Sequence, residues 1–178
     1  MKNKLFAAAV LSLVLSPALA ADGAISVNYV FEGDHQVDFS SMARGPLRVG
    51  EITDGRAVDN PMLIAGDIVA DKALADIVRD ALVQGFLKGN AGLVESEEKL
   101  ILEGSIVSSE TAVSGDTLQI TIRTSVQLRN AGRTIWETVL FGRGSAPVAE
   151  GANAALTDAL DRTIRSLVLD DYFLMEVL

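Results

Sequence analysis

The stretch Asp116–Arg129 (DTLQITIRTSVQLR) constrains the fold of this chain more than any other. Apolar residues occupy alternate positions from Leu118 to Leu128, interrupted only by Thr124, and polar residues lie between them. This period-two alternation is typical of a β-strand that buries one face in a core and turns the other to water. The polar face has a single charged residue, Arg123. We therefore predict a central strand whose polar face either docks a partner or is simply solvated.

Two short glycine-containing turns predict that this strand has an antiparallel neighbour on each side. Residues 114–116 (SGD) connect it to a predicted strand at Lys99–Val113, and residues 130–132 (NAG) connect it to another at Arg133–Arg143. Turns this short join antiparallel strands, so the region predicts a three-stranded meander. The only tryptophan, Trp136, lies in the last strand and either packs on the sheet or stacks on a ligand.

Two amphipathic helices and one more strand complete the predicted domain. Apolar residues recur every three or four positions over Asp71–Lys88 and over Glu150–Leu169. Each helix should bury one stripe and leave its other side, which includes Gln84, in water. The further strand is Pro46–Asp54, with a bulge at Gly50, where the parity of the apolar residues changes.

The order of these elements predicts an α+β fold, a two-layer sandwich arranged as strand, helix, three-strand meander and helix. The sheet should be mainly antiparallel, with both helices packed on one face. The crossover between Asp54 and Lys99 is long enough to place the first strand parallel to a neighbour. The apolar tail Tyr172–Leu178 either docks on the core or binds a partner.

The beginning of the chain is typical of a bacterial secretory signal. Residues 1–20 combine two lysines, an apolar run and a small-residue cleavage motif that ends at Ala20. An uncleaved membrane anchor is the alternative, but the run is shorter than the roughly 20 residues that a spanning helix needs. We expect an N-terminal strand or arm at Ala24–Phe31, a loop without periodicity at Glu32–Gly45, and a single α+β domain at residues 46–178.

Charge and composition argue against several classes of function. The chain carries 15 basic and 24 acidic residues, a net charge of −9, which disfavours nucleic acid and anionic lipid headgroups as partners. It has no cysteine, so we expect neither thiolate metal sites nor lipidation at a lipobox. The single histidine, His35, lies in the predicted loop, and we find no catalytic triad, phosphate loop or metal-ligand motif.

We therefore expect no enzyme activity, no cofactor and no bound metal. The mature protein should be soluble and periplasmic, with no transmembrane segment after signal cleavage and no lipid anchor.

Several motifs resemble the YajG-like family of envelope proteins. They are VGEITDGR at Val49–Arg56 and ALVQGF at Ala81–Phe86, followed by the hairpin strands and the second helix. The resemblance covers Leu47–Leu169. Members of that family are typically outer-membrane lipoproteins with a compact α+β fold, and this chain departs from them because it lacks the lipobox cysteine. The resemblance implies the same fold and an envelope setting, and it implies no catalytic residue.

These observations predict a non-enzymatic module for protein interaction or assembly, with an envelope protein as its partner. The alternative is a periplasmic protein that binds a small ligand or lipid in a pocket between the helices and the sheet. Asp54 and Arg56, which flank a turn glycine, and Trp136 are the candidate binding residues for that pocket. Arg123 is the candidate on the polar sheet face.

Overall fold

The structure is a computed structural model that describes residues 24–96 and 98–178. The predicted signal peptide, residues 1–20, lies outside the described residues. In the part of the chain that is described, no helix is both long enough and apolar enough to cross a membrane.

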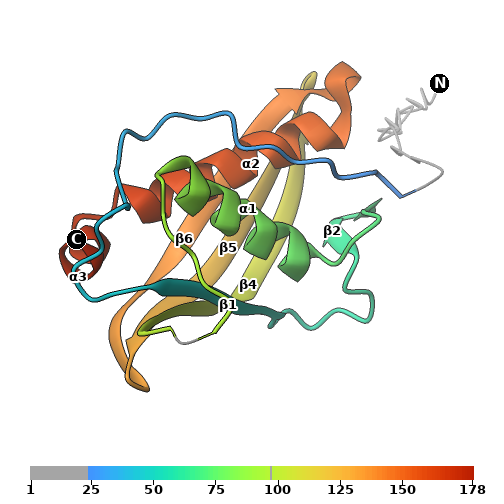
Figure 1. The fold of residues 1–178 in the computed structure, drawn as a ribbon. Helices are drawn as coiled ribbons and strands as arrows, with labels where there is room; N and C mark the ends of the chain where they lie inside the picture. The colour runs from blue at the N-terminus through green and yellow to red at the C-terminus, as the bar shows by residue number, and fades with distance from the viewer. Residues whose placement is uncertain (1–23, 97) are drawn as a thin grey trace, which may run out of the picture.

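One four-stranded sheet organises the molecule, with its strands in the order β1-β4-β5-β6 (Figure 1). The strands are β1 (Leu47–Asp54), β4 (Leu100–Ser114), β5 (Thr117–Asn130) and β6 (Arg133–Pro147). β1 is parallel to β4, and β4, β5 and β6 form an antiparallel meander. The meander and the parallel first strand are confirmed, as is the bulge in β1, where the register shifts between Val49 and Ile52. The last strand extends beyond its predicted end, to Pro147.

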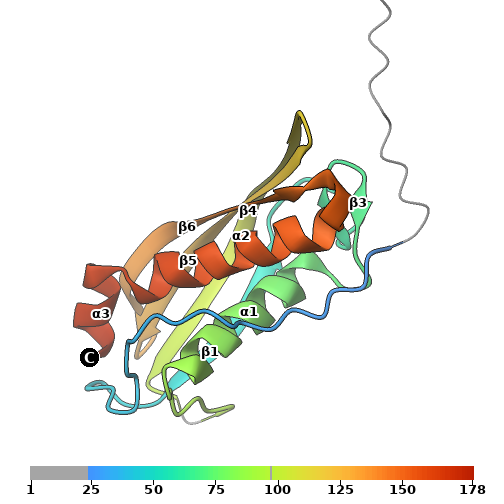
Figure 2. The ribbon, with the colours of Figure 1, turned by 90° about the horizontal axis from the view of Figure 1, so that it is seen from above.

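The two long helices cover one face of this sheet, and no segment within residues 24–96 and 98–178 covers the other face (Figures 1 and 2). They are α1 (Leu74–Lys88) and α2 (Gly151–Val168), and a 3-10 turn at Val148–Glu150 leads into α2. A small second sheet, β2 (Leu63–Ala65) with β3 (Ile68–Val69), precedes α1. The α+β fold class is therefore confirmed.

The apolar tail forms a third helix, which the sequence did not predict. This helix, α3 (Asp171–Val177), buries Phe173 and Val177. Its N-cap, Asp170, accepts a hydrogen bond of 2.7 Å from the Phe173 amide. The tail is therefore docked on the core.

Strand β5 is the centre of the core. Its inward side chains are all buried: Leu118, Ile120, Ile122, Thr124, Val126 and Leu128. Burying a leucine or isoleucine stabilises a fold by about 1.5–3 kcal/mol. Because a slip of one residue would turn this whole set toward water, the pattern fixes the register of the sheet.

Helix α2 lies directly against the backbone of β6. A side chain at Gly142 or Gly144 would overlap the backbone of α2 at Ala155 and Ala159. Small residues on both elements therefore allow this close approach.

The residues before the sheet, 25–39, form an extended segment that we call the strap, and it runs lengthwise along α1 and α2 (Figure 2). Every odd-numbered residue of the strap is buried or half-buried, and every even-numbered residue is exposed. Phe31, His35 and Phe39 are the largest buried side chains in this series. The arm predicted at Ala24–Phe31 agrees with this segment. The lack of periodicity predicted for Glu32–Gly45 was wrong over residues 32–39, because polar His35 and small Gly33 stand at inward positions and hid the period of two.

Hydrogen bonds fasten the strap to α1. The Gln84 side chain donates to the Tyr29 carbonyl (3.0 Å) and accepts from the Phe31 amide (2.8 Å), as a neighbouring strand would. Further along, the Phe39 amide donates to the Gly89 carbonyl, and an imidazole nitrogen of His35 lies 2.9 Å from the Gly85 carbonyl oxygen. The prediction that the Gln84 side of α1 is solvated was therefore wrong, because the strap covers it.

Gly144→Ala is predicted to destabilise the fold by about 1–3 kcal/mol, the usual cost of overpacking a tight contact. The added Cβ would overlap the Ala155 carbonyl oxygen, so α2 would have to move off the sheet. The matched control is Gly92→Ala, where an added Cβ meets nothing within 4 Å. Urea denaturation measures both variants, and equal midpoints would contradict the close contact.

Candidate functional site

The side of the sheet that faces away from α1 and α2 is the candidate site, and we call it the outer face. It carries the polar residues of β5 predicted from the alternation, namely Gln119, Thr121, Arg123, Ser125 and Gln127. No described segment packs over these residues in the views of Figures 1 and 2. The outer face divides into an acidic part and a cationic part.

The acidic part is a shallow hollow of about 420 Å³ that touches all four strands. Glu51, Glu103 and Glu137 line it, together with hydroxyl groups of neighbouring residues. Glu103 accepts hydrogen bonds from Arg129 (2.8 Å) and Gln127 (3.0 Å). Glu51 and Glu137 have no ion pair or hydrogen bond to another side chain within residues 24–96 and 98–178, so they are free to accept hydrogen bonds from a partner.

The cationic part is a stack of two arginines on one aromatic ring. The guanidinium carbons of Arg123 and Arg143 lie 5.3 Å and 5.0 Å from the centre of the Phe141 ring. Arg123 also forms an ion pair of 2.9 Å with Glu110. The Phe141 side chain is 39% exposed, and its neighbour Val139 is 53% exposed. Arginine beside exposed aromatic surface is the composition that protein interfaces favour.

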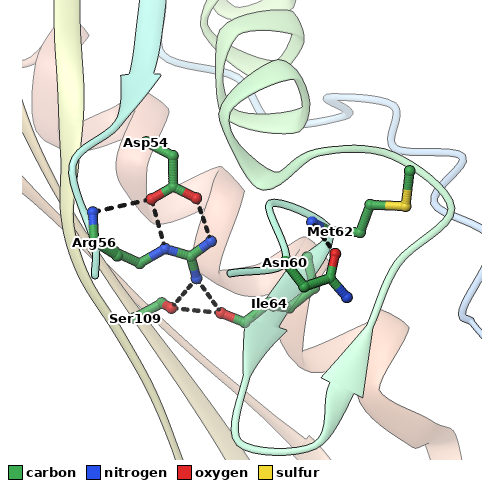
Figure 3. A network of polar contacts seen from close by, with 6 residues as sticks. All are labelled: Asp54, Arg56, Asn60, Met62, Ile64 and Ser109. Atoms are coloured by element: carbon green, nitrogen blue, oxygen red, sulfur yellow. Dashed lines mark hydrogen bonds and ion pairs between the residues drawn. The ribbon is translucent and has the colours of Figure 1, made fainter. Parts of the chain in front are cut away.

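Asp54 and Arg56 form a nearly buried ion pair at the end of β1 (Figure 3). Nε and Nη2 of Arg56 donate to the two Asp54 carboxylate oxygens at 2.9 Å and 2.6 Å, a bidentate pair. Nη1 donates to the Ile64 carbonyl (2.9 Å) and to the Ser109 hydroxyl (2.6 Å). The Arg56 side chain is only 6% exposed, so it ties β1 to β2 and β4 and has little capacity left for a ligand.

This pairing lowers the pKa of the Asp54 carboxyl. Hydrogen bonds from the Arg56 side chain are the largest cause, and the Arg56 backbone amide and positive charge act in the same direction. Burial opposes them, because it disfavours the charged form. The carboxylate is therefore held in its ionised form, as a structural ion pair requires.

Trp136 lies on the helix side of the sheet, opposite Leu128. It is 8% exposed, its ring packs edge-on against Phe173 with centroids 5.0 Å apart, and its indole N–H donates to Asp170 at 3.2 Å. These contacts join β6 to α3 and leave little of the ring free to stack on a ligand.

The structure therefore brings together only two of the four predicted site residues, Asp54 and Arg56. Trp136 lies in a separate contact with α3, and Arg123 lies on the opposite face of the sheet. Sequence reasoning missed Phe141 and Arg143, which join Arg123. The sequence of β6 gives no clear signal for them, because Val139, Leu140 and Phe141 are consecutive apolar residues and do not show which parity faces outward.

Residues 24–96 and 98–178 contain no group of three or more His, Cys, Asp or Glu side chains placed to hold a metal ion.

Among solved structures, the chain is similar to a protein of the DUF330 family from Xanthomonas campestris. The two are 16% identical, the match covers 80% of this chain and 90% of that one, and the TM-score is 0.63, which shows a shared fold. More distant matches are a minor lipoprotein from Acinetobacter baumannii and a putative lipoprotein from Caulobacter crescentus. The first is 8% identical, covers 77% of this chain and 96% of that one, and has a TM-score of 0.47. The second is 13% identical, covers 57% and 82%, and has a TM-score of 0.44.

The fold thus defines an α+β domain of a kind found in other bacterial proteins. Residues 64–173 match the family described as "LptE: Lipopolysaccharide-assembly", and the chain belongs to this family. No protein of curated function matches it. The YajG-like resemblance implied a family of envelope proteins, and the match supports an envelope family in general. The family that it identifies is the lipopolysaccharide-assembly family and not the YajG-like family.

Asp54→Asn is predicted to lower stability at neutral pH by about 3 kcal/mol, since it leaves the Arg56 charge buried without its partner. A carboxyl with a lowered pKa stabilises the folded state above its ordinary value of 3.8, and this contribution is lost as the pH falls through the lowered pKa. Wild-type stability should therefore fall toward that of the variant in acid.

The control is Glu110→Gln, which breaks an exposed ion pair with Arg123 and should cost at most about 1 kcal/mol. Thermal melting at neutral and acidic pH measures all three proteins. A gap between wild type and Asp54→Asn that does not narrow in acid would contradict this role of Asp54.

Proposed function

We propose that this protein is a non-enzymatic envelope-assembly module that binds an envelope protein through the outer face of its sheet. The observation that carries the proposal is the asymmetry of the two layers. The strap packs against α1 and α2 on the side that faces away from the sheet, whereas no described segment packs on the outer face.

The composition of the outer face supports a protein partner. It presents free carboxylates at Glu51 and Glu137 beside the Arg123–Phe141–Arg143 stack, so a complementary surface can be recognised by charge of both signs. Exposed Val139 adds apolar area. Membership of the lipopolysaccharide-assembly family supports an envelope setting for that partner.

The export prediction agrees with this setting. The signal-like sequence at residues 1–20 would carry the chain to the periplasm, and the absence of cysteine from the sequence argues against lipidation there. Binding to a small ligand or lipid near Asp54, Arg56 and Trp136 is less well supported, because contacts within the protein occupy these side chains.

The proposal predicts that a photo-crosslinking amino acid at Ser125, in the middle of the outer face, captures an envelope protein in living cells. The matched control places the same amino acid at Glu32, which is exposed on the strap. Mass spectrometry identifies the captured proteins. An envelope protein captured from Ser125 and not from Glu32 supports the proposal, and equal capture from both sites, or none from Ser125, contradicts it.

A further inference from the structure

Strand β6 forms an edge of the sheet whose backbone groups point away from β5. The amide of Ser145 shows the direction, because it donates 3.0 Å to the Asp158 carboxylate of α2 and not to β5. Along an antiparallel strand, alternate residues direct their N–H and C=O groups to the same side. The odd-numbered residues of the segment Glu137–Arg143 therefore present these groups beyond the edge, and within the described residues nothing outside the strand pairs with them.

The other edge of the sheet, β1, is blocked. From α1, the Arg79 guanidinium donates to the carbonyls of Gly50 (3.0 Å) and Val49 (3.2 Å). The Val94 amide donates to the Leu47 carbonyl (3.1 Å). The contrast matters because an unblocked edge strand is a template on which another strand can pair.

The free part of the β6 edge has a self-complementary sequence. It is ETVLFGR, Glu137–Arg143, with Leu140 at its centre, and Asp158 closes the edge just beyond it at Ser145. The outer-face side chains, in order, are Glu137, Val139, Phe141 and Arg143: an acid, two apolar residues and a base. Reversing this order places the base against the acid and the two apolar residues against each other.

We propose that two copies of this chain pair through β6, antiparallel, about a twofold axis at Leu140, and form one continuous eight-stranded sheet. In this register Glu137 lies opposite the partner's Arg143, and Val139 lies opposite the partner's Phe141, each pair occurring twice. Opposite charges and aromatic with β-branched side chains are favourable cross-strand pairs.

Charge selects this register over its neighbours. The hydrogen-bonding groups allow only registers that place odd-numbered residues opposite odd-numbered ones. Centring the pair on Phe141 would put Val139 against the partner's Arg143, and centring it on Val139 would put Glu137 against the partner's Phe141. Both shifts lose the two ion pairs.

The pairing also covers exposed apolar surface and leaves the helices in place. Val139 and Phe141 are 53% and 39% exposed in the single chain, and no charge or proline stands between Glu137 and Arg143 to discourage pairing. Helix α2 lies over the inner side of β6 at Gly142 and Gly144, and it reaches the edge through Asp158, at Ser145.

Charge reversal tests the proposal. Sedimentation of the protein as the cell exports it should give twice the mass of one chain. Glu137→Arg and Arg143→Glu each place like charges opposite one another twice, so each should raise the dimer dissociation constant about tenfold or more. The double variant restores opposite charges and should restore the dimer. A monomeric wild type would overturn the proposal, whether its β6 edge is bare or is bound by another envelope protein. A dimer that neither single variant weakens would overturn it as well.

A second measurement does not depend on charge or on the folding of those variants. The chain has no cysteine, so mild oxidation of a Val139→Cys/Phe141→Cys variant should give a disulfide-linked dimer on a non-reducing gel. Val113→Cys is the matched control, since Val113 is 51% exposed but lies on β4. Covalent dimer from the control at the same yield, or none from the β6 variant, contradicts the pairing.

Discussion

The packing of α1 and α2 between the sheet and the strap is the constraint on which the rest of this structure depends. The sheet covers the inner side of α1 and α2, and the strap covers the side that faces away from the sheet through Phe31, His35 and Phe39. Gln84 supplies to the strap the hydrogen bonds that a neighbouring strand would provide. One side of α2, with Arg162 and Arg165, stays exposed beside the strap. The outer face is the side of the sheet that no described segment covers. This division of surfaces is the basis for the proposed interaction role.

Residues predicted as a binding site proved to have two different uses. The hydrogen bonds of Asp54 and Arg56 join β1 to β2 and β4, and the hydrogen bond of Trp136 joins β6 to α3. Among the four, Arg123 alone lies on the outer face, where it and Arg143 both contact the ring of Phe141. Polar residues beside a turn and a lone tryptophan are thus as useful for fastening elements together as for holding a ligand.

The sequence predicts the sheet and the long helices because their patterns are strong and local. Partners across strands are harder to predict, and Arg123 shows why. Counting back from the closing pair Asn130–Arg133 places Leu140 opposite Arg123, but an irregularity near Leu128 adds one residue to β6 and brings Phe141 there instead. A shift of one residue moves a side chain to the other face, so the cluster was not predictable from the turn. The second half of the strap, residues 32–39, was missed for a different reason: its inward positions include His35 and Gly33, which do not read as apolar.

Amide hydrogen exchange along the strap, residue by residue, tests the central claim most directly. If the strap is fastened to the helices, the amides of Phe31 and Phe39, which donate to Gln84 and to the Gly89 carbonyl, should exchange far more slowly than those of their exposed neighbours. Loss of the slow amides in a Gln84→Ala variant would connect the protection to the observed bonds. Fast exchange throughout residues 25–39 of the wild type would contradict the account, because the helices would then offer a second open surface.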